Sequence, residues 1–464
     1  MRKLLAIRSG ELCVLASLLT LLGCSTSDGA RAGDSAGAVA GDSSAGTAGG
    51  AGTSDAGGSS SDAGGATGAG GSGTSGTSGD AGTDSGPTIV NGCTIPALPS
   101  FAKLTTNYKL PDPFMSLDKT RITQQSQWAC RREEIAAELQ EYELGPLPAK
   151  SGTVTGAMNA GSITVTVQDG ANSISFDATI TLPTGGSAPY PALVTIGASP
   201  LVGKVPMPGV AVITFNNDDM AVQTPTSRGM GKFYTMFGAD HPAGAMIAWT
   251  WGVSRLIDAL QTTPDAQIDT THLAVTGCSR NGKGALVVGA FEDRIALVIP
   301  EESGTGGVGS WRVADMQAIK MTVQTAAEIV SEAPWFRSSF GMFNASVARL
   351  PYDHHMLMAM VAPRALLAIE NTSMEWLGNV STYTDSVEAH TVWEALGIPD
   401  KMGFSQIGGH MHCDFPASQQ PEVSAYVQRF LLGDDTQNTT IMETDGGYTV
   451  DMATWVDWTT PTLQ

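Results

Sequence analysis

The stretch T-G-C-S-R-N-G-K-G-A, from Thr276 to Ala285, is the most informative segment of the chain. It is close to the pattern glycine-x-serine-x-glycine, in which a serine stands on a sharp turn between a strand and a helix. Gly277 stands two residues before Ser279, as that turn requires, but the next glycine, Gly282, comes one residue late. The stretch alone leaves open whether Ser279 is a nucleophile or part of a glycine-rich loop.

The residues around this stretch alternate between short apolar runs and helical segments. The runs typical of buried strands are Pro191–Ile196, Val210–Phe215, His272–Thr276, Ile295–Pro300, Ala365–Glu370 and Met402–Ile407. Helical segments are expected at Pro242–Thr262, Asn281–Phe291, Met316–Val330 and Thr382–Leu396. Earlier in the chain, apolar and polar residues alternate as in half-buried antiparallel strands at Ser162–Gln168 and Ser173–Pro183.

Short buried strands that alternate with helices indicate a parallel sheet covered on both faces. Antiparallel strands that lead into such a sheet fit the α/β-hydrolase arrangement. We therefore predict an α/β fold of the α/β-hydrolase type, a three-layer αβα sandwich with a mainly parallel central sheet and antiparallel N-terminal strands.

In this fold Ser279 lies between the strand His272–Cys278 and the helix Asn281–Phe291. A serine on such a turn exposes its hydroxyl at the edge of the sheet, and the small Gly277 lets strand and helix approach closely. The N-terminus of the helix and nearby N–H groups can stabilise an oxyanion. The late Gly282 weakens the match to the pattern but not the geometry.

A serine nucleophile needs a base, and a carboxylate is needed to orient that base. In α/β-hydrolases these residues follow in the order serine, acid, histidine. Of the seven histidines, His410 and His412 follow the last predicted strand, which suits the base. The candidate acids at or after the two strands that follow the serine are Glu301, Glu302, Glu370 and Glu375.

Residues 1–24 are expected to be a lipoprotein signal peptide. They have a basic start and a short apolar run, Leu12–Gly23, which is too short to span a membrane. The segment Leu21–Ser25 resembles a bacterial lipoprotein box, in which the cysteine becomes the lipidated first residue. A plain secretory signal is the alternative. We expect a secreted protein of the bacterial outer membrane or cell surface, bound to the membrane only through a lipid on Cys24.

Composition divides the rest of the chain into two parts. Residues 25–88 consist almost entirely of Gly, Ser, Ala, Thr and Asp, so they cannot offset their ordering entropy by burying apolar surface. We predict a disordered linker over 25–88 and one catalytic domain over 89–464. The formal net charge of −20, from 25 basic and 45 acidic residues, argues against nucleic acid or an anionic membrane surface as partner.

Four of the six cysteines belong to the folded part, because Cys13 and Cys24 lie in the leader. An exported protein meets oxidising conditions, so two disulfides are expected. The residues themselves allow three pairings among Cys93, Cys130, Cys278 and Cys413.

Thr276–Ala285, together with the segments Glu302–Gly307 and His412-Cys413, resembles the glucuronoyl esterases of carbohydrate esterase family 15. The likeness extends over most of Cys93–Gln464, and its further motifs are Tyr142–Pro146, Val323–Ala326, Tyr352–His355, Ala362–Leu367 and Glu375–Gly378. The nucleophile turn of this family has the same late glycine, so the resemblance favours Ser279 as a nucleophile.

The resemblance implies a role for individual residues. Ser279 matches the nucleophile, His412 the base and Glu302 the usual acid. Some bacterial relatives carry the acid after the later strand, so Glu370 and Glu375 stay open as alternatives. Arg280 matches the residue that helps to hold the oxyanion. The positions that bind the uronic acid sugar are matched by Lys283, Gln324, Glu332 and Trp376.

Two further expectations concern the surroundings of these residues. Family members join the cysteine before the serine to the cysteine after the histidine, which implies the disulfides Cys278–Cys413 and Cys93–Cys130. His410 and His412 with Cys413 and Asp414 could instead bind a metal. Alternate residues on a loop, without a distant ligand motif, do not favour that interpretation, so we expect no metal.

The resemblance implies a serine esterase that needs no cofactor. Its substrate would be the ester between 4-O-methyl-D-glucuronic acid of glucuronoxylan and an alcohol of lignin, a lignin-carbohydrate ester. We expect the enzyme to be a monomer. The alternatives are another carbohydrate ester hydrolase, such as an acetyl xylan esterase, and a non-catalytic protein that binds polysaccharide at the cell surface.

Overall fold

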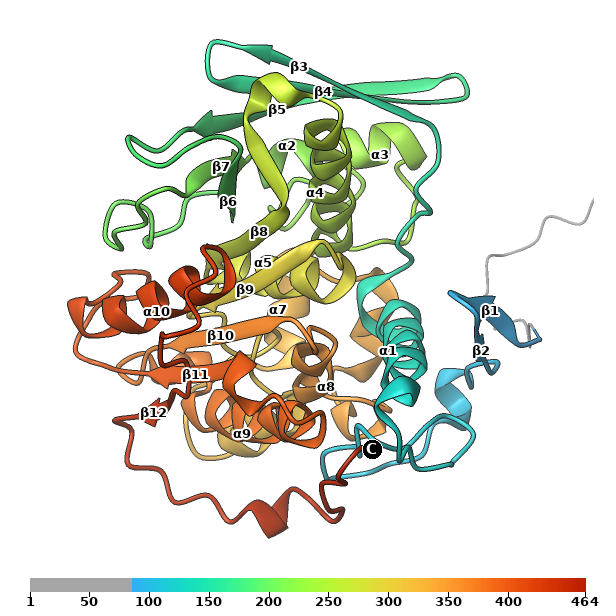
Figure 1. The fold of residues 1–464 in the computed structure, drawn as a ribbon. Coiled ribbons are helices and arrows are strands. Elements are labelled where there is room, and N and C mark those ends of the chain that lie inside the picture. Colours follow the sequence, from blue (N-terminus) through green and yellow to red (C-terminus); the bar gives the residue numbers. More distant parts are fainter. Residues whose placement is uncertain (1–85) are drawn as a thin grey trace, which may run out of the picture. The chain divides into compact units, whose positions relative to one another are not determined.

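The computed structural model describes residues 86–464 (Figure 1). The predicted signal peptide with Cys24 and the linker up to residue 85 lie outside the described residues. The first strand begins at Thr88, the last residue of the predicted linker. Within the described part, no helix is long and apolar enough to cross a membrane.

A sheet of ten strands organises the domain, in the order β12-β11-β10-β9-β8-β6-β7-β5-β4-β3. Neighbouring strands run parallel from β12 to β7, and β5, β4 and β3 extend the sheet antiparallel. The antiparallel strands are β3 Thr153–Asn159, β4 Ser162–Asp169 and β5 Asn172–Thr181. The parallel strands are β6 Tyr190–Ile196, β7 Ala211–Phe215, β8 Ile268–Cys278, β9 Ile295–Glu301, β10 Ala365–Glu370, β11 Met402–Gln406 and β12 Met442–Thr444.

Ten α-helices lie around this sheet in the described part (Figure 1). They are α1 Gln125–Leu139, α2 Asn217–Met220, α3 Lys232–Phe237, α4 Ala245–Gln261, α5 Arg280–Phe291, α6 Trp311–Ala318, α7 Ala326–Glu332, α8 His354–Ala359, α9 Asn379–Ala395 and α10 Gln420–Phe430. A two-stranded antiparallel sheet, β1 Thr88–Val90 with β2 Cys93–Ile95, precedes them, and the disulfide Cys93–Cys130 ties it to α1.

Successive side chains of the central strands enter two separate hydrophobic clusters. Val298 of β9 and Leu366 of β10 belong to the large cluster that contains residues of α4, α5, α8 and α9. Their neighbours Leu297 and Leu367 belong to the smaller cluster formed with α10. Because side chains alternate between the two faces of a strand, both faces are covered. The result is a three-layer α/β-hydrolase fold, which confirms the predicted fold class.

The predicted helix Met316–Val330 is wrong as a single element. Helix α6 ends at Ala318 and α7 begins at Ala326. Thr325 caps α7, since its side chain accepts a hydrogen bond from the N–H of Glu328. Gln324 donates its backbone N–H to the carbonyl of Trp376 at 2.9 Å, a tertiary contact that competes with helix formation. This break brings Gln324 to the pocket described below.

Candidate active site

Ser279 stands on the turn between β8 and α5, with a φ of 61° and a ψ of −128°. This φ lies in the left-handed region, which residues other than glycine rarely adopt. The Ser279 N–H donates to the carbonyl oxygen of Glu301 at 2.9 Å, and the Ser279 carbonyl accepts from the N–H of Lys283 at 3.0 Å. Strained backbone of this kind persists only where the surroundings hold it, and it is concentrated at functional sites.

Both glycines around Ser279 are required by close packing. A Cβ on Gly277 would lie 2.5 Å from the carbonyl oxygen of Asn281. A Cβ on Gly282 would lie 2.5 Å from the carbonyl oxygen of Glu301. The late glycine therefore allows the first turn of α5 to pack on the end of β9. Asn281, which occupies the place of the expected glycine, accepts a hydrogen bond from Asn217 at 3.3 Å.

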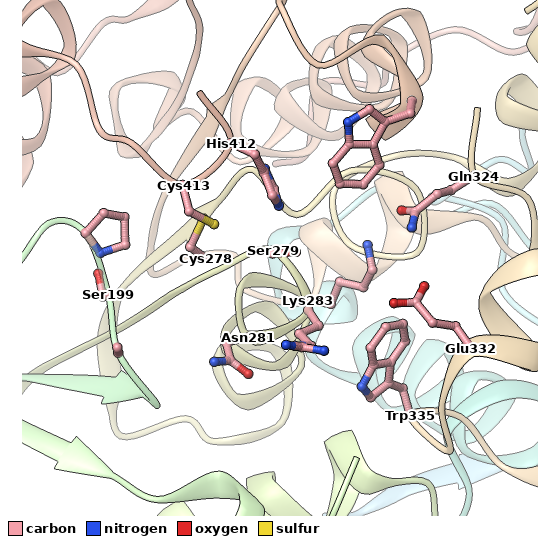
Figure 2. Close-up of a pocket in the computed structure, with 14 residues that line it drawn as sticks. Ser199, Cys278, Ser279, Asn281, Lys283, Gln324, Glu332, Trp335, His412 and Cys413 are labelled. Atoms are coloured by element: carbon pink, nitrogen blue, oxygen red, sulfur yellow. A yellow bond between two sulfur atoms is a disulfide. The ribbon is translucent and has the colours of Figure 1, made fainter. Parts of the chain in front are cut away.

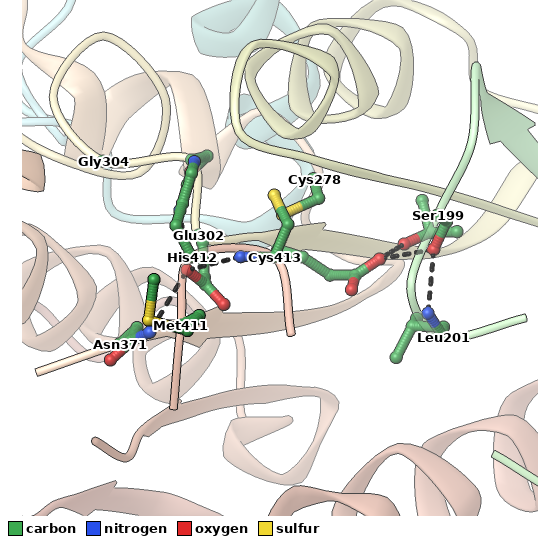
Figure 3. Close-up of a disulfide and its surroundings, with 12 residues drawn as sticks. Ser199, Leu201, Cys278, Glu302, Gly304, Asn371, Met411, His412 and Cys413 are labelled. Carbon is green, nitrogen blue, oxygen red and sulfur yellow. Dashed lines mark hydrogen bonds and ion pairs between the residues drawn. A yellow bond between two sulfur atoms is a disulfide. The ribbon is translucent and has the colours of Figure 1, made fainter. Parts of the chain in front are cut away.

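The side chains of His412 and Glu302 are in hydrogen-bond contact beside this turn. The Nδ1 atom of His412 lies 2.7 Å from Oε2 of Glu302 (Figure 3). The same oxygen accepts the backbone N–H of Cys413 at 3.1 Å and a side-chain N–H of Asn371 at 3.3 Å. The opposite ring nitrogen of His412, Nε2, is buried and has no hydrogen-bond partner among the described residues. That nitrogen is available to a proton donor in the pocket.

The other candidate acids lie elsewhere. Glu370 accepts hydrogen bonds from the N–H and hydroxyl of Ser303 at 2.8 and 3.0 Å and from the N–H of Gly304 at 3.1 Å. Glu375 is exposed to solvent. Within residues 86–464, neither carboxylate makes a hydrogen bond or ion pair to His412. The geometry therefore favours Glu302, whose φ of 41° directs it away from the line of β9.

A disulfide joins the two loops that carry Ser279 and His412. Cys278 precedes the serine, Cys413 follows the histidine, and their sulfur atoms are bonded (Figure 3). Both expected disulfides are therefore present, which is typical of an exported protein. These sulfurs and a His412 ring nitrogen lie within 4.8 Å of one another, but sulfurs in a disulfide are not thiolates, the form that binds zinc.

A pocket of about 540 Å³ opens at this edge of the sheet. Figure 2 shows His412, Ser279 and the disulfide on one side and Gln324, Glu332 and Trp335 on the other. Every residue to which the sequence assigned nucleophile, base, oxyanion or sugar-binding roles lines it: Ser279, His412, Arg280, Lys283, Gln324, Glu332 and Trp376. Glu302, the predicted acid, is buried and contacts His412.

Lys283 reaches the pocket from the first turn of α5. Its Nζ atom donates to the carbonyl oxygens of Ser303 and, at 2.8 Å, Thr305. An ammonium group has three donors, so one is left for a ligand. Burial lowers the pKa of Lys283 to about 8, although the nearby Glu370 and Glu332 oppose this shift. The lysine is thus not the solvated helix residue that its position alone would indicate.

Two tryptophans form part of the wall of the pocket. Trp376 packs edge-on against His412, with ring centroids 4.9 Å apart. Trp335 was not identified from the sequence, and neither were the pocket residues Ser199 and Asn281. Trp335 follows Pro334 directly after α7, and its indole N–H donates to Gln223 at 2.9 Å. A tryptophan three residues after a candidate ligand, Glu332, is the signal that could have found it.

His354 and His355 are not among the residues that line the pocket. His354 is fully buried, and its ring contacts Glu143 at 2.8 Å and the carbonyl of Gly307 at 2.6 Å. Burial disfavours its charge, but Glu143, Asp353 and the carbonyl of Gly307 together outweigh burial and raise the pKa of His354. His355 contacts the carbonyl of Pro111. The contact with Gly307 ties His354 to the segment that also carries Ser303 and Thr305, the acceptors of Lys283.

Comparisons with known proteins agree with this geometry. Residues 165–397 match the family model described as glucuronyl esterase of fungi. The 4-O-methyl-glucuronoyl methylesterase of Hypocrea jecorina is 48% identical over 379 residues, which cover 81% of each chain. The structure of a glucuronoyl esterase catalytic domain from Hypocrea jecorina has a TM-score of 0.75 at 47% identity and covers 79% of this chain and 100% of that chain.

A third similar protein carries a ligand. It is a mutant of the glucuronoyl esterase from Sporotrichum thermophile, in complex with methyl 4-O-methyl-beta-D-glucopyranuronate. It is 44% identical, with a TM-score of 0.74, and covers 78% of this chain and 97% of that chain. By its fold, its matched motifs and this degree of identity, the chain belongs to the glucuronoyl esterases, carbohydrate esterase family 15.

Proposed function

We propose that this protein is a serine esterase that hydrolyses esters of 4-O-methyl-D-glucuronic acid. The observation that carries the proposal is the pocket that unites Ser279, His412 and Lys283. A relative 44% identical to this chain is named as a complex with a methyl ester of that sugar acid. Such an ester is neutral and rich in hydroxyl groups, which the amine, amide, carboxylate and indole groups of this pocket suit.

In the proposed reaction His412 takes the proton of the Ser279 hydroxyl through its free Nε2 atom. The serine oxygen attacks the C6 carbonyl of the uronate and forms a tetrahedral oxyanion. The bond to the alcohol breaks, and the alcohol leaves with the proton from His412. Water, activated by the same imidazole, then releases the glucuronoyl group. The Glu302 carboxylate keeps Nδ1 of His412 protonated and stabilises the imidazolium.

The oxyanion would be stabilised at the start of α5. Arg280 is the first residue of that helix and is exposed at the pocket, so its side chain and its backbone N–H are both candidate donors. The N-terminus of the helix adds a positive potential. We assign the sugar-binding role to Lys283, Gln324, Glu332 and Trp376, because all four line the pocket. Gln324 and Glu332 lie on the side away from the disulfide (Figure 2).

The natural substrate is proposed to be the lignin-carbohydrate ester, in which the uronic acid belongs to glucuronoxylan and the alcohol to lignin. We propose a monomer. An acetyl xylan esterase is the second candidate function.

The test is hydrolysis of benzyl glucuronate beside acetylated xylan. The wild-type protein is expected to prefer benzyl glucuronate, and Ser279→Ala to abolish turnover. Glu302→Ala is expected to lose most of kcat. The matched control is Glu375→Ala, a change at an exposed carboxylate, which should leave kcat unchanged. Preference for acetylated xylan would replace the proposal with the acetyl esterase function. Activity that survives Ser279→Ala would refute the mechanism.

We also propose export followed by lipid anchoring at Cys24, on the sequence Leu21–Ser25. The expected mature protein begins with the lipidated Cys24 and stays with the outer membrane or cell surface. Mass spectrometry of the N-terminal peptide from cells that make the wild type or Cys24→Ala tests this. An unmodified wild-type N-terminus would favour a plain secretory signal instead.

A further inference from the structure

Glu301 is a buried carboxyl group that the proposed reaction does not use. It is the last residue of β9 and is 1% exposed. Its Oε1 atom lies 2.6 Å from the hydroxyl oxygen of Ser199 and 2.8 Å from that of Thr276. Its Oε2 atom is buried and has no hydrogen-bond partner among the described residues. A charged carboxylate in this place would be poorly solvated, because burial of a charge is costly unless it is paired.

The protonation of Glu301 follows from the hydrogen bonds of Thr276. The Thr276 hydroxyl oxygen also lies 2.7 Å from the carbonyl oxygen of Ile299. A carbonyl oxygen only accepts, and a threonine hydroxyl has one proton, so Thr276 donates that proton to Ile299. Its contact with Glu301 is then a hydrogen bond only if the carboxyl group donates. If Thr276 gave its proton to Glu301 instead, two acceptor oxygens would face each other at 2.7 Å.

Ser199 completes the arrangement. Its hydroxyl donates to Glu301 and accepts the backbone N–H of Leu201 at 3.2 Å (Figure 3). Ser199 and its neighbours Ala198 and Pro200 follow β6 and line the pocket beside Ser279. In α/β-hydrolases, a backbone N–H from the corresponding loop forms part of the oxyanion hole. The position of this loop is therefore coupled to the position of Glu301.

We propose that Glu301 is a positioning residue, a neutral carboxylic acid that clamps the Ser199 loop to β8 and thereby shapes the oxyanion side of the pocket. Its consequence for catalysis rests on the proposed function, whereas its protonation does not. In this proposal the two adjacent glutamates have different roles. Glu302 is a carboxylate beside His412, and Glu301 is a neutral acid beside Thr276.

The clamp is expected to open as the pH rises. Burial raises the pKa of Glu301 to about 7, against the hydrogen bond that the Ser199 hydroxyl donates. The charged groups that act on it are Glu302, which adds to the rise, and Lys204, which opposes it and pairs with Asp414 on the His412 loop. Loss of the proton above about pH 7 would turn the Thr276 contact into a repulsion between two oxygens.

Infrared difference spectroscopy of wild type against Glu301→Gln tests the protonation without any substrate. The expected result at pH 6 is a protonated carboxyl band in the wild type that the variant lacks and that disappears above pH 7. A carboxylate band at pH 6 would overturn the proposal. Thr276→Val gives a second test. If Thr276 accepts a hydrogen bond from Glu301, its removal should lower the pKa of Glu301. If Thr276 donates to Glu301 instead, its removal should raise that pKa.

Kinetics on benzyl glucuronate test the positioning role. Glu301→Ala is expected to lose about tenfold or more in kcat, as misplaced catalytic groups do. Glu301→Gln should restore kcat to within about threefold, since an amide N–H can replace the carboxyl proton as the donor to Thr276. In the wild type, kcat should fall above pH 7 as Glu301 loses its proton, and Glu301→Gln should not show this fall. Equal losses of kcat in Glu301→Ala and Glu301→Gln would overturn the positioning role. If the wild type does not hydrolyse benzyl glucuronate, the proposed function is rejected, but the infrared test of Glu301 protonation remains valid.

Discussion

Replacement of Glu302 by glutamine should separate the charge of this residue from its hydrogen bonds. Three N–H groups converge on Oε2 of Glu302, those of His412, Cys413 and Asn371. The glutamine should therefore place its carbonyl oxygen at that position, because its NH₂ group there would face three donors. His412 then keeps its Nδ1 proton, and only the negative charge is lost.

The expected size of the effect follows from Coulomb's law. Two unit charges about 4 Å apart interact by about 4 kcal/mol at an effective dielectric constant of about 20. The Glu302 side chain is only 4% exposed, so solvent screening from its side is weak. Since the imidazolium of His412 exists only after proton transfer, this energy belongs to the transition state. We expect kcat to fall by roughly 10²- to 10³-fold in Glu302→Gln.

Glu302→Ala should be more severe, because all three donors lose their acceptor and the tautomer of His412 is no longer held. The expected loss in kcat is about 10⁴-fold, the order seen when a triad histidine takes the wrong tautomer. The assay is the steady-state hydrolysis of benzyl glucuronate, with Glu375→Gln as the matched control. A Glu302→Gln variant within threefold of wild type would refute the electrostatic argument. Equal losses in the glutamine and alanine variants would refute the argument from the three donors.

Three further changes test other parts of the site. Removal of the Cys278–Cys413 disulfide, which spans 135 residues, should lower the free energy of unfolding by about 2–5 kcal/mol, measured by denaturant titration of the double serine variant. Because Lys283 loses its proton above about pH 8, KM for benzyl glucuronate should rise there in the wild type, whereas Lys283→Met should have a high KM that does not change at this pH. Gly282→Ala should destabilise the protein by roughly 1–3 kcal/mol and lower kcat, since its Cβ would lie 2.5 Å from a backbone oxygen of β9. Gly341→Ala, whose nearest neighbour would be 3.8 Å away, should be close to neutral, and equal melting temperatures for the two variants would contradict the packing argument.

The central sheet could be predicted from the sequence because its strands are buried on both faces. Such strands are short apolar runs between helical segments, a local pattern that needs no knowledge of the fold. The prediction of β10 as Ala365–Glu370 agrees with the structure at both ends. The helix expected at Met316–Val330 was wrong because a contact between Gln324 and Trp376, distant in sequence, is not visible in local periodicity.

The motifs of the chain also predicted roles for Ser279, His412 and the residues expected to bind the sugar, and the structure brings these residues to one pocket. For the acid, the motifs matched Glu302 but left Glu370 and Glu375 open as alternatives. Glu301, Glu302 and Glu370 are all buried at the ends of two neighbouring strands, so composition and position do not distinguish them. Only the folded backbone does so: Glu301 continues the strand toward Ser199, while the left-handed turn at Glu302 directs its carboxylate to His412. Residue type and order are local properties of a chain, but the direction of a side chain depends on the backbone around it.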